Sequence, residues 1–173
     1  PPWWCGRLRR LRERAGLDEH GGITGIYTVL VEGDDMNDPV GDTARSILDG
    51  HITLSRALAS QGHFPTIDVL DSVSRVSGAV TTPEQQRMAR ELRALLAAHK
   101  EARDLIEIGA YRPGTNPTVD RAVALRDRIE AFLRQGMNET SAPGVAWNQL
   151  AELLATDTFT AEMAGAQTGG GVL

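Results

Sequence analysis

The sequence has few of the residues on which small secreted proteins and metal-binding proteins depend. It contains one cysteine, Cys5, which excludes an intrachain disulfide and a cysteine-rich metal site. No apolar run approaches the roughly 20 residues that a membrane-spanning helix requires. The N-terminal stretch PPWWCGRLRR also lacks the apolar core of a secretory signal. These absences predict a reducing, cytoplasmic setting.

Lysine and aromatic residues are also scarce. Lysine occurs once, at Lys100, so the other 17 cationic side chains are arginine, which we attribute first to a codon bias. Aromatics make up 5% of the 173 residues and hydrophobic residues 41%, so the core must be mainly aliphatic. The formal net charge of -5 gives no general attraction to nucleic acid or to an anionic membrane. The arginine-rich stretch RLRRLRER is therefore interpreted as a solvated helix face instead of an RNA-binding arm.

The first half of the chain alternates helical and strand patterns. The segment 6–16 is expected to form a short helix that Gly16 ends. The run ITGIYTVLV, residues 23–31, is apolar almost throughout, which is typical of a strand covered on both faces in a parallel sheet. Asp38 before Pro39 is a good helix N-cap, and the helix that follows is expected to end at Gly50.

Further along, the alternation continues. Residues 51–55 are a second strand candidate or a strand-like connection, and a short helix then ends near Gly62. The block IDVLDSVSRV starts at Ile67 and ends on Arg75 and Val76. Strands alternating with helices predict an α/β sheet over this half.

From Thr82 the pattern becomes entirely helical. Thr82 and Pro83 start one amphipathic helix to about Ile108, with an apolar stripe at spacings of three and four: Met88, Leu92, Leu95, His99, Ala102 and Ile106. We interpret His99 as a packed histidine, because no other ligand type stands at metal-binding spacing on the same face.

Two more helices are expected before the C-terminus. After the turn-rich YRPGTNP, one helix follows with Val119, Ala122, Val123, Ile129, Phe132 and Leu133 facing inward, and another follows with Val145, Leu150, Leu153 and Leu154 inward. Residues 156–173 lose this period and gain glycine, so they are expected to be disordered. The predicted division is therefore 1–81, 82–155 and a tail.

No complete catalytic centre can be assigned from local motifs. The sequence contains no GxxxxGK[ST] phosphate loop, no GxGxxG and no HExxH. The acidic loop EGDDMND lacks the alternating ligands, central glycine and final glutamate of an EF-hand. A solvated loop or a partner contact is the better interpretation of that loop.

Three long blocks nevertheless carry a resemblance. VLVEGDDMNDP, ARSILDGHI and IDVLDSVSRV resemble the late part of the ATPase domain of flagellum-specific, type III protein-export ATPases, homologues of the catalytic subunit of F-type ATP synthases. The resemblance covers residues 22–76 almost without gaps and continues more loosely to about 155. It implies the C-terminal part of a RecA-like P-loop ATPase domain followed by an all-α C-terminal domain. SVSRV followed by AVTTPEQ favours the flagellar branch over the virulence branch.

The resemblance also implies roles for single residues. Arg75 matches the arginine that reaches from one subunit into the nucleotide site of its neighbour, where a guanidinium can stabilise the charge of the γ-phosphate. Phe64, in GHFP, and Tyr111, in IGAYRPG, match two aromatics that lie against the adenine base of ATP. Read without the family, Arg75 would be a surface arginine, and each aromatic a core or hinge residue.

The same resemblance implies partners. Asp34, Asp35 and Asp38 match a loop that faces the central pore of a homohexameric ring and contacts a coiled-coil stalk protein. The helical domain matches the part that docks the stalk, export cargo, chaperones and a regulator, so the protein is expected at the export apparatus, only peripherally at the membrane.

The sequence departs from the family at its start. The phosphate loop, the catalytic glutamate and the magnesium-site aspartate of the family are missing, and PPWWC does not fit the family pattern. We therefore expect a truncated product or gene fragment that neither binds nor hydrolyses ATP alone, with the site for ATP and Mg²⁺ incomplete. The alternative is a non-enzymatic module, or inactive remnant, that binds a stalk protein or a chaperone.

Overall fold

The computed structural model describes residues 6, 10, 15–31 and 38–166. The side chains of residues 17, 18 and 156–166 lie outside that description. The chain divides into two compact units, of which the first comprises residues 1–51 and 73–76 and the second residues 52–72 and 77–173. Each unit is described by itself.

The first unit contains a small β-hairpin. Strand β1 (Gly16–Asp18) pairs antiparallel with β2 (Gly21–Ile23), with Gly16 opposite Ile23. Gly6 and Arg10 are helical, as expected, and most of the other residues of the predicted helix lie outside the described residues. The end of that helix lies outside the described residues, and Gly16 begins a strand.

The predicted strand at residues 23–31 is also wrong beyond Ile23. Residues 24–31 have no regular secondary structure, and Ile26 and Leu30 are 92% and 94% exposed. An apolar strand of this kind is stable only between neighbouring strands and under covering layers. Both sheets in the described part of the chain have only two strands, and neither includes residues 24–31.

Helix α2 (Pro39–Ile47) begins where the sequence predicts. The Asp38 carboxylate accepts hydrogen bonds from the backbone N–H groups of Val40 and Gly41, at 3.0 and 3.3 Å. The helix ends at Ile47 and not at Gly50, since Gly50 already begins strand β3.

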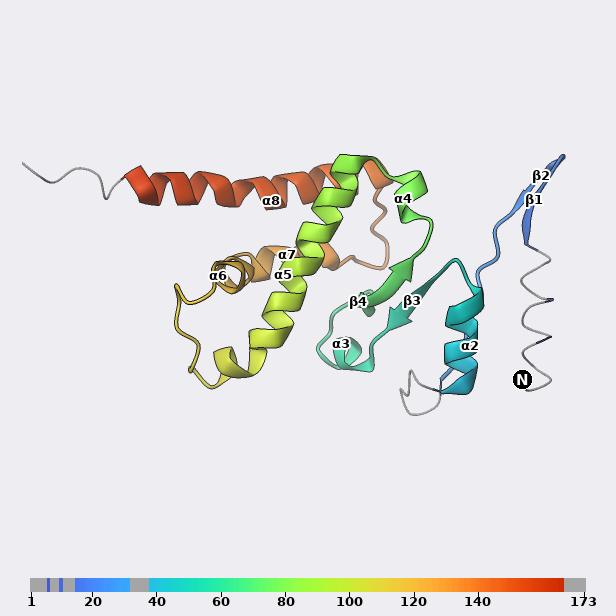
Figure 1. Cartoon of the computed structure of the whole chain (residues 1–173), viewed down its shortest axis with the longest axis horizontal. Helices are drawn as coiled ribbons and strands as arrows, with labels where there is room; N and C mark the ends of the chain where they lie inside the picture. The colour runs from blue at the N-terminus through green and yellow to red at the C-terminus, as the bar shows by residue number, and fades with distance from the viewer. Residues whose placement is uncertain (1–5, 7–9, 11–14, 32–37, 167–173) are drawn as a thin grey trace, which may run out of the picture. The chain divides into compact units, whose positions relative to one another are not determined.

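Strands β3 (Gly50–Leu54) and β4 (Ile67–Ser74) form the second sheet. They run antiparallel, as Figure 1 shows and as the hydrogen bonds Ser55 N to Thr66 O and Arg75 N to Asp49 O require. Between them lies α3 (Arg56–Ser60), which Ser55 caps. The strand predicted at 51–55 is confirmed, and its partner β4 runs antiparallel to it.

The helical part of the second unit follows the short helix α4 (Ser77–Val80), which the sequence analysis did not predict. Helix α5 (Pro83–Glu107) starts with a capping box, in which Thr82 accepts from Gln85 N and the Gln85 side chain accepts from Thr82 N. Its predicted start and length are confirmed.

The next predicted helix is divided into two. Helix α6 (Pro117–Ala124) and α7 (Arg126–Leu133) meet at Leu125, which lies outside both helices but is buried. Helix α8 (Pro143–Ala166) extends past residue 155, where we expected helical structure to end.

The hydrophobic core lies among α5, α6, α7 and α8. It is almost wholly aliphatic, as the composition predicts, and consists of Met88, Leu92, Leu95, Ala122, Leu125, Ile129, Leu150, Leu153 and Leu154. Two residues predicted to face inward do not: Val123 is 41% exposed and Val145 49%. Val123 follows the buried Ala122 by one position, and adjacent helical residues point about 100° apart.

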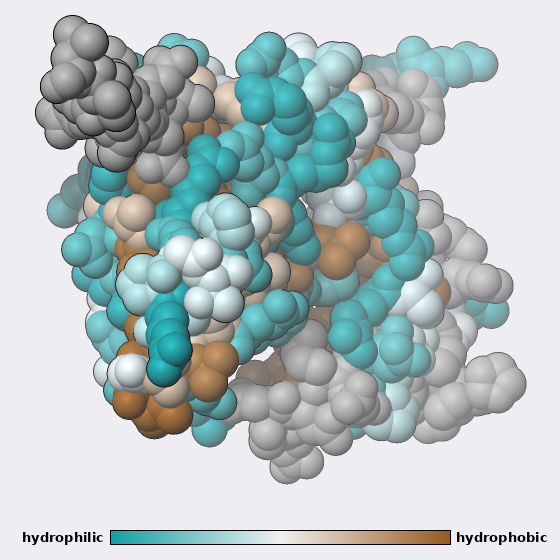
Figure 2. All heavy atoms as spheres, turned by 60° about the vertical axis from the view of Figure 1, so that its left-hand side comes forward, coloured by the Kyte–Doolittle hydropathy of each residue, from teal (hydrophilic) through white to brown (hydrophobic). Residues whose placement is uncertain are grey.

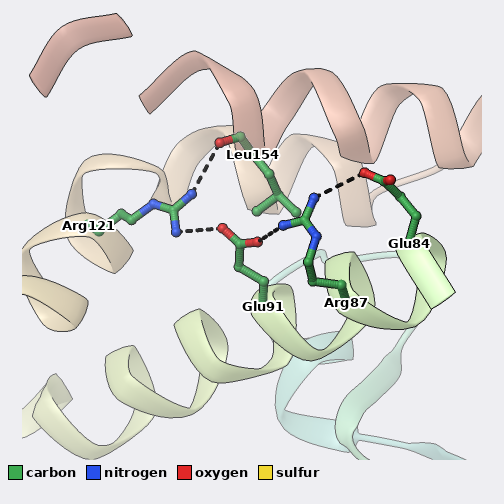
Figure 3. A network of polar contacts seen from close by, with 5 residues as sticks. All are labelled: Glu84, Arg87, Glu91, Arg121 and Leu154. Carbon is green, nitrogen blue, oxygen red and sulfur yellow. Dashed lines mark hydrogen bonds and ion pairs between the residues drawn. The ribbon is translucent and has the colours of Figure 1, made fainter. Parts of the chain in front are cut away.

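An ion-pair network joins three of these helices (Figure 3). Glu91 on α5 accepts from Arg121 on α6 at 2.6 Å and from Arg87 at 3.1 Å, and Arg87 also pairs with Glu84 at 3.1 Å. The second Arg121 nitrogen, Nη2, donates to the carbonyl oxygen of Leu154 on α8 at 3.1 Å. One arginine thus connects α6 to both α5 and α8 beside the core.

Apolar side chains also remain exposed outside this core. Ile52 and Leu54, which alternate on one face of β3, are 71% and 67% exposed. Figure 2 shows such hydrophobic residues among the hydrophilic ones that dominate the visible surface. That face of β3 is therefore largely uncovered in the described part of the chain. None of the helices in the described residues is both long and apolar enough to cross a membrane.

Candidate functional site

Arg75 lies immediately after β4 and is exposed. Its backbone N–H donates to Asp49 O at 2.9 Å. Its guanidinium donates to the carbonyl oxygens of Ser46 at 3.4 Å and Arg45 at 3.2 Å, which belong to the last turn of α2. Carbonyls in the last turn of a helix have no partner within the helix, and they favour a cation. These contacts use two of the five N–H donors of the guanidinium, so the remainder can bind an anion.

Phe64 presents an exposed ring from a fixed backbone. The side chain is 56% exposed, and its carbonyl oxygen accepts from Gln135 N at 2.9 Å. The preceding residue, His63, is buried and has its Nδ1 atom 3.5 Å from Nε of Arg134. An exposed aromatic ring on an anchored backbone can stack on another flat group.

Tyr111 lies in the turn between α5 and α6 and is half-buried. Its hydroxyl donates toward the Asp120 carboxylate at 2.9 Å and the Asn116 carbonyl at 3.2 Å. Burial, and then the hydrogen bond and the negative charge of Asp120, raise the pKa of the Tyr111 phenol. The ring is therefore neutral and held at its outer end.

The predicted site residues are distributed over both units. Arg75 belongs to the first unit, and Phe64 and Tyr111 to the second. In the described part of the chain, the hydrogen bonds of Phe64 and Tyr111 go to different partners and do not join the two aromatics.

The acidic loop is described only at its end. Asp34 and Asp35 lie outside the described residues, whereas Asp38 serves as the N-cap of α2. Within residues 15–31 and 38–166, no group of three or more histidine, cysteine or acidic side chains is placed to hold a metal ion.

His99 is a packed side chain, as predicted. It lines a small cavity with Leu95, Leu96, Ala122, Arg126, Ile129 and Glu130. Burial, followed by the charge of Arg126, lowers the pKa of His99. Both effects disfavour the charged form of the imidazole.

Two residues with specific contacts were not singled out from the sequence. Arg93 on α5 donates to three carbonyl oxygens of β4, those of Val69, Leu70 and Ser72, at 2.6, 2.9 and 3.2 Å. Asp120 holds Tyr111. Asp120 could have been found from its place in the first turn of the helix that follows Asn116-Pro117. Nothing in the sequence indicated Arg93, because its partners are main-chain carbonyls, which every residue carries.

Two family models match different parts of the chain. The family model of the ATP synthase alpha/beta family nucleotide-binding domain matches residues 1–74, and that of the T3SS EscN ATPase C-terminal domain matches residues 81–152. The chain is therefore built from part of an ATP-synthase-type nucleotide-binding domain and a secretion-ATPase helical domain.

Relatives and solved structures that are similar to this chain are secretion and flagellar ATPases. The chain is 53% identical to the type 3 secretion system ATPase of Pseudomonas syringae pv. tomato over 139 residues, which are 80% of this chain and 31% of the relative. It is 49% identical to the flagellum-specific ATP synthase of Bacillus subtilis over 132 residues, 76% of this chain and 30% of the relative. The structure of the assembled ATPase EscN from the enteropathogenic E. coli type III secretion system matches with a TM-score of 0.84 at 44% identity, covering 88% of this chain and 37% of that one. The structure of EscN in complex with its central stalk EscO matches with a TM-score of 0.79 at 42% identity, covering 88% of this chain and 36% of that one.

The chain belongs to the family of type III secretion and flagellum-specific ATPases. It spans about a third of the length of these curated relatives. Relatives of both branches match, so the flagellar branch stays a prediction.

Proposed function

We propose that this chain is a segment of the ATP-hydrolysing ring subunit that energises type III protein export, in the flagellar branch. In this proposal Arg75 acts in trans on the nucleotide of a neighbouring subunit, and Phe64 and Tyr111 contact the adenine base. The observation that carries the proposal is the exposed Arg75 directly after β4, held by main-chain carbonyls and retaining free donors.

The substrate in this proposal is ATP with Mg²⁺. An exposed guanidinium suits a phosphate oxygen and an exposed aromatic ring suits a base, so Arg75 and Phe64 fit the nucleotide. The described residues include no ligand set for Mg²⁺. In this proposal the phosphate loop, whose GxxxxGK[ST] pattern the sequence lacks, belongs to another part of the ring subunit, and the chain alone should show no saturable ATP turnover.

The direct test is a chimeric ATPase, in which the matched 139-residue part of this chain replaces the corresponding segment of the Pseudomonas syringae enzyme. Arg75→Ala should lower kcat by roughly three to five powers of ten, as loss of other arginine fingers does, with ATP affinity little changed. Arg90→Ala, at an exposed position on α5, is the control and should keep normal turnover. Near-normal hydrolysis by Arg75→Ala rings would refute the assignment.

A mixing experiment separates a trans role from a structural one. Arg75→Ala subunits are mixed with subunits whose phosphate-loop lysine is replaced. If Arg75 serves a neighbouring site, mixed rings contain interfaces with one intact loop and one intact Arg75, so part of the activity returns. If Arg75 only stabilises α2 in its own subunit, mixing restores no activity.

We also propose that the loop with Asp34, Asp35 and Asp38 contacts a coiled-coil stalk protein, and that the helical domain docks cargo, chaperones and a regulator. The structure of EscN with its central stalk EscO supports a stalk partner. Charge reversal at Asp34 and Asp35 should abolish stimulation of the chimera by the stalk protein while basal hydrolysis persists. Intact stimulation would exclude the loop as the contact.

A non-enzymatic binding module is the second candidate. The core residues all come from α5 to α8, so the helical part has a core of its own. If the 173-residue chain binds the stalk protein as tightly as the chimera does, binding does not need the ring, and this function is favoured.

A further inference from the structure

A single carboxylate ties Tyr111 to the turn that carries it. Asp120, in the first turn of α6, accepts the Tyr111 hydroxyl on Oδ1 at 2.9 Å and the backbone N–H of Gly114 on Oδ2 at 2.8 Å. Both of its oxygens are therefore bonded within the segment that links α5 and α6.

The rest of this segment is also fixed. Tyr111 N donates to Leu105 O at 3.0 Å, so the residue is anchored to the end of α5. The Thr115 hydroxyl donates to Arg112 O at 2.7 Å, and the Asn116 side chain caps α6 through Thr118 N at 3.0 Å. Gly114 has a φ of 88°, which a residue with a side chain rarely adopts. These bonds fix the turn, and Asp120, at 2.9 Å, is the nearer of the two acceptors that hold the tyrosine hydroxyl, the other being the Asn116 carbonyl at 3.2 Å.

We propose that Asp120 is a positioning residue that holds the ring of Tyr111 ready to stack on the nucleotide base. The inference rests on the proposed function, in which Tyr111 contacts the adenine. A ring held in place before binding loses less conformational freedom when the base arrives, which strengthens binding without altering the chemical step. The hydroxyl bond fixes the ring at its tip.

The hydrogen bond itself can be tested on the 173-residue chain without nucleotide. Tyr27→Phe leaves Tyr111 as the only tyrosine, and its ionisation is followed by absorbance near 295 nm. Asp120→Asn should then lower the pKa of Tyr111 toward its ordinary value, because the negative charge that opposes the phenolate is gone. Asp127→Asn, in the first turn of α7, is the matched control and should leave the titration unchanged. An unchanged titration in Asp120→Asn would overturn the proposal.

The effect on nucleotide is measured in the chimera. Asp120→Ala should raise KM for ATP by about three- to ten-fold, the value expected for one immobilised side chain, with kcat unchanged. Tyr111→Phe keeps the ring but loses the hydroxyl, so it should give the same increase, and the double variant should give no more than either single one. Asp127→Ala should behave as the parent chimera.

These results separate positioning from a general structural role. If Asp120 only stabilised the fold, Asp120→Ala would lower the melting temperature and the fraction of active subunits, so kcat would fall while KM stayed constant. That outcome, or additive effects of Asp120→Ala and Tyr111→Phe, overturns the inference. Tyr111→Ala tests the proposed function separately: if it raises KM while Asp120→Ala does not, only the role of Asp120 fails, and if it leaves KM unchanged, the base contact itself fails.

Discussion

The contact of Arg93 with β4 should be a large single contribution to the stability of the second unit. One half-buried guanidinium donates to three carbonyl oxygens of the strand, at 2.6, 2.9 and 3.2 Å. The strand needs this partner because it is irregular here: the Asp68 carboxylate accepts from the N–H groups of Leu70 and Asp71, which turns the chain locally. Replacing Arg93 by lysine keeps the charge but removes the fork that reaches several oxygens.

The expected magnitude follows from the number of bonds lost. A hydrogen bond to a charged donor contributes about 1.5–3 kcal/mol when buried, and water partly replaces such bonds at a half-buried site. If lysine retains one bond of the three, Arg93→Lys should lower the free energy of unfolding by about 2–3 kcal/mol. For a chain of this size, 1 kcal/mol corresponds to roughly 2–4 °C, so the melting temperature should fall by about 4–12 °C.

The assay is urea unfolding of the 173-residue chain, followed by circular dichroism at 222 nm and by tryptophan fluorescence, since Trp147 packs against the core. Arg90→Lys is the matched control, because Arg90 lies on the same helix and is exposed, and it should change stability by less than about 0.5 kcal/mol. A loss below that same limit for Arg93→Lys would show that the three contacts contribute nothing measurable, and the reasoning would be refuted.

Three further predictions concern single residues. Asp38→Ala removes the N-cap of α2 and should accelerate amide hydrogen exchange at its N-terminus about five-fold, as a loss of about 1 kcal/mol implies; unchanged exchange would contradict it. Leu95→Ala, at a side chain 2% exposed, should cost about 2–5 kcal/mol in urea unfolding, unlike an exposed alanine substitution on α5. Burial and Arg126 lower the pKa of His99, so the unfolded chain binds the proton more readily than the folded chain does. The free energy of unfolding should therefore fall as the pH drops below about 6.5. His99→Gln should reduce this dependence of the free energy of unfolding on pH.

The sequence predicted best those features that depend on neighbouring residues. The start of α2 follows from Asp38 before Pro39, and the start of α5 from Thr82 before Pro83, because a cap and a proline act within one turn. The buried stripe of α5 was equally predictable, since a period of 3.6 places the apolar residues on one face whatever lies opposite.

Features that depend on distant partners could not be predicted in the same way. The run at 23–31 has the composition of a buried strand, yet Ile26 and Leu30 are almost fully exposed, because a strand exists only where another strand pairs with it. Leu125 is apolar and in register with its helix, but the chain turns there so that α6 and α7 can both contact the core. The division of one predicted helix into α6 and α7 depends on tertiary packing, so hydrophobic periodicity alone could not predict it.

The candidate site also combines residues that the sequence indicated with residues that it did not. Arg75, Phe64 and Tyr111 were identified through long sequence blocks shared with the family, and local chemistry alone would have passed over each of them. Asp120 and Arg93 act on groups that sequence patterns do not reveal: a turn amide and a phenol in one case, and strand carbonyls in the other.

The contacts of Arg75 suit the role that we propose better than an ion pair would. An arginine that meets a phosphate must be oriented beforehand, but its charge must not already be neutralised by a carboxylate. In the described residues its guanidinium donates to two helix carbonyls, which are neutral groups at the weakly negative end of α2. Such contacts are worth about 0.3–1 kcal/mol each at an exposed site, far less than a phosphate bearing full charges offers in a closed site. Arg75 can therefore be held in place by its own subunit and still prefer the phosphate when one is present, whereas a carboxylate at the same position would compete with it.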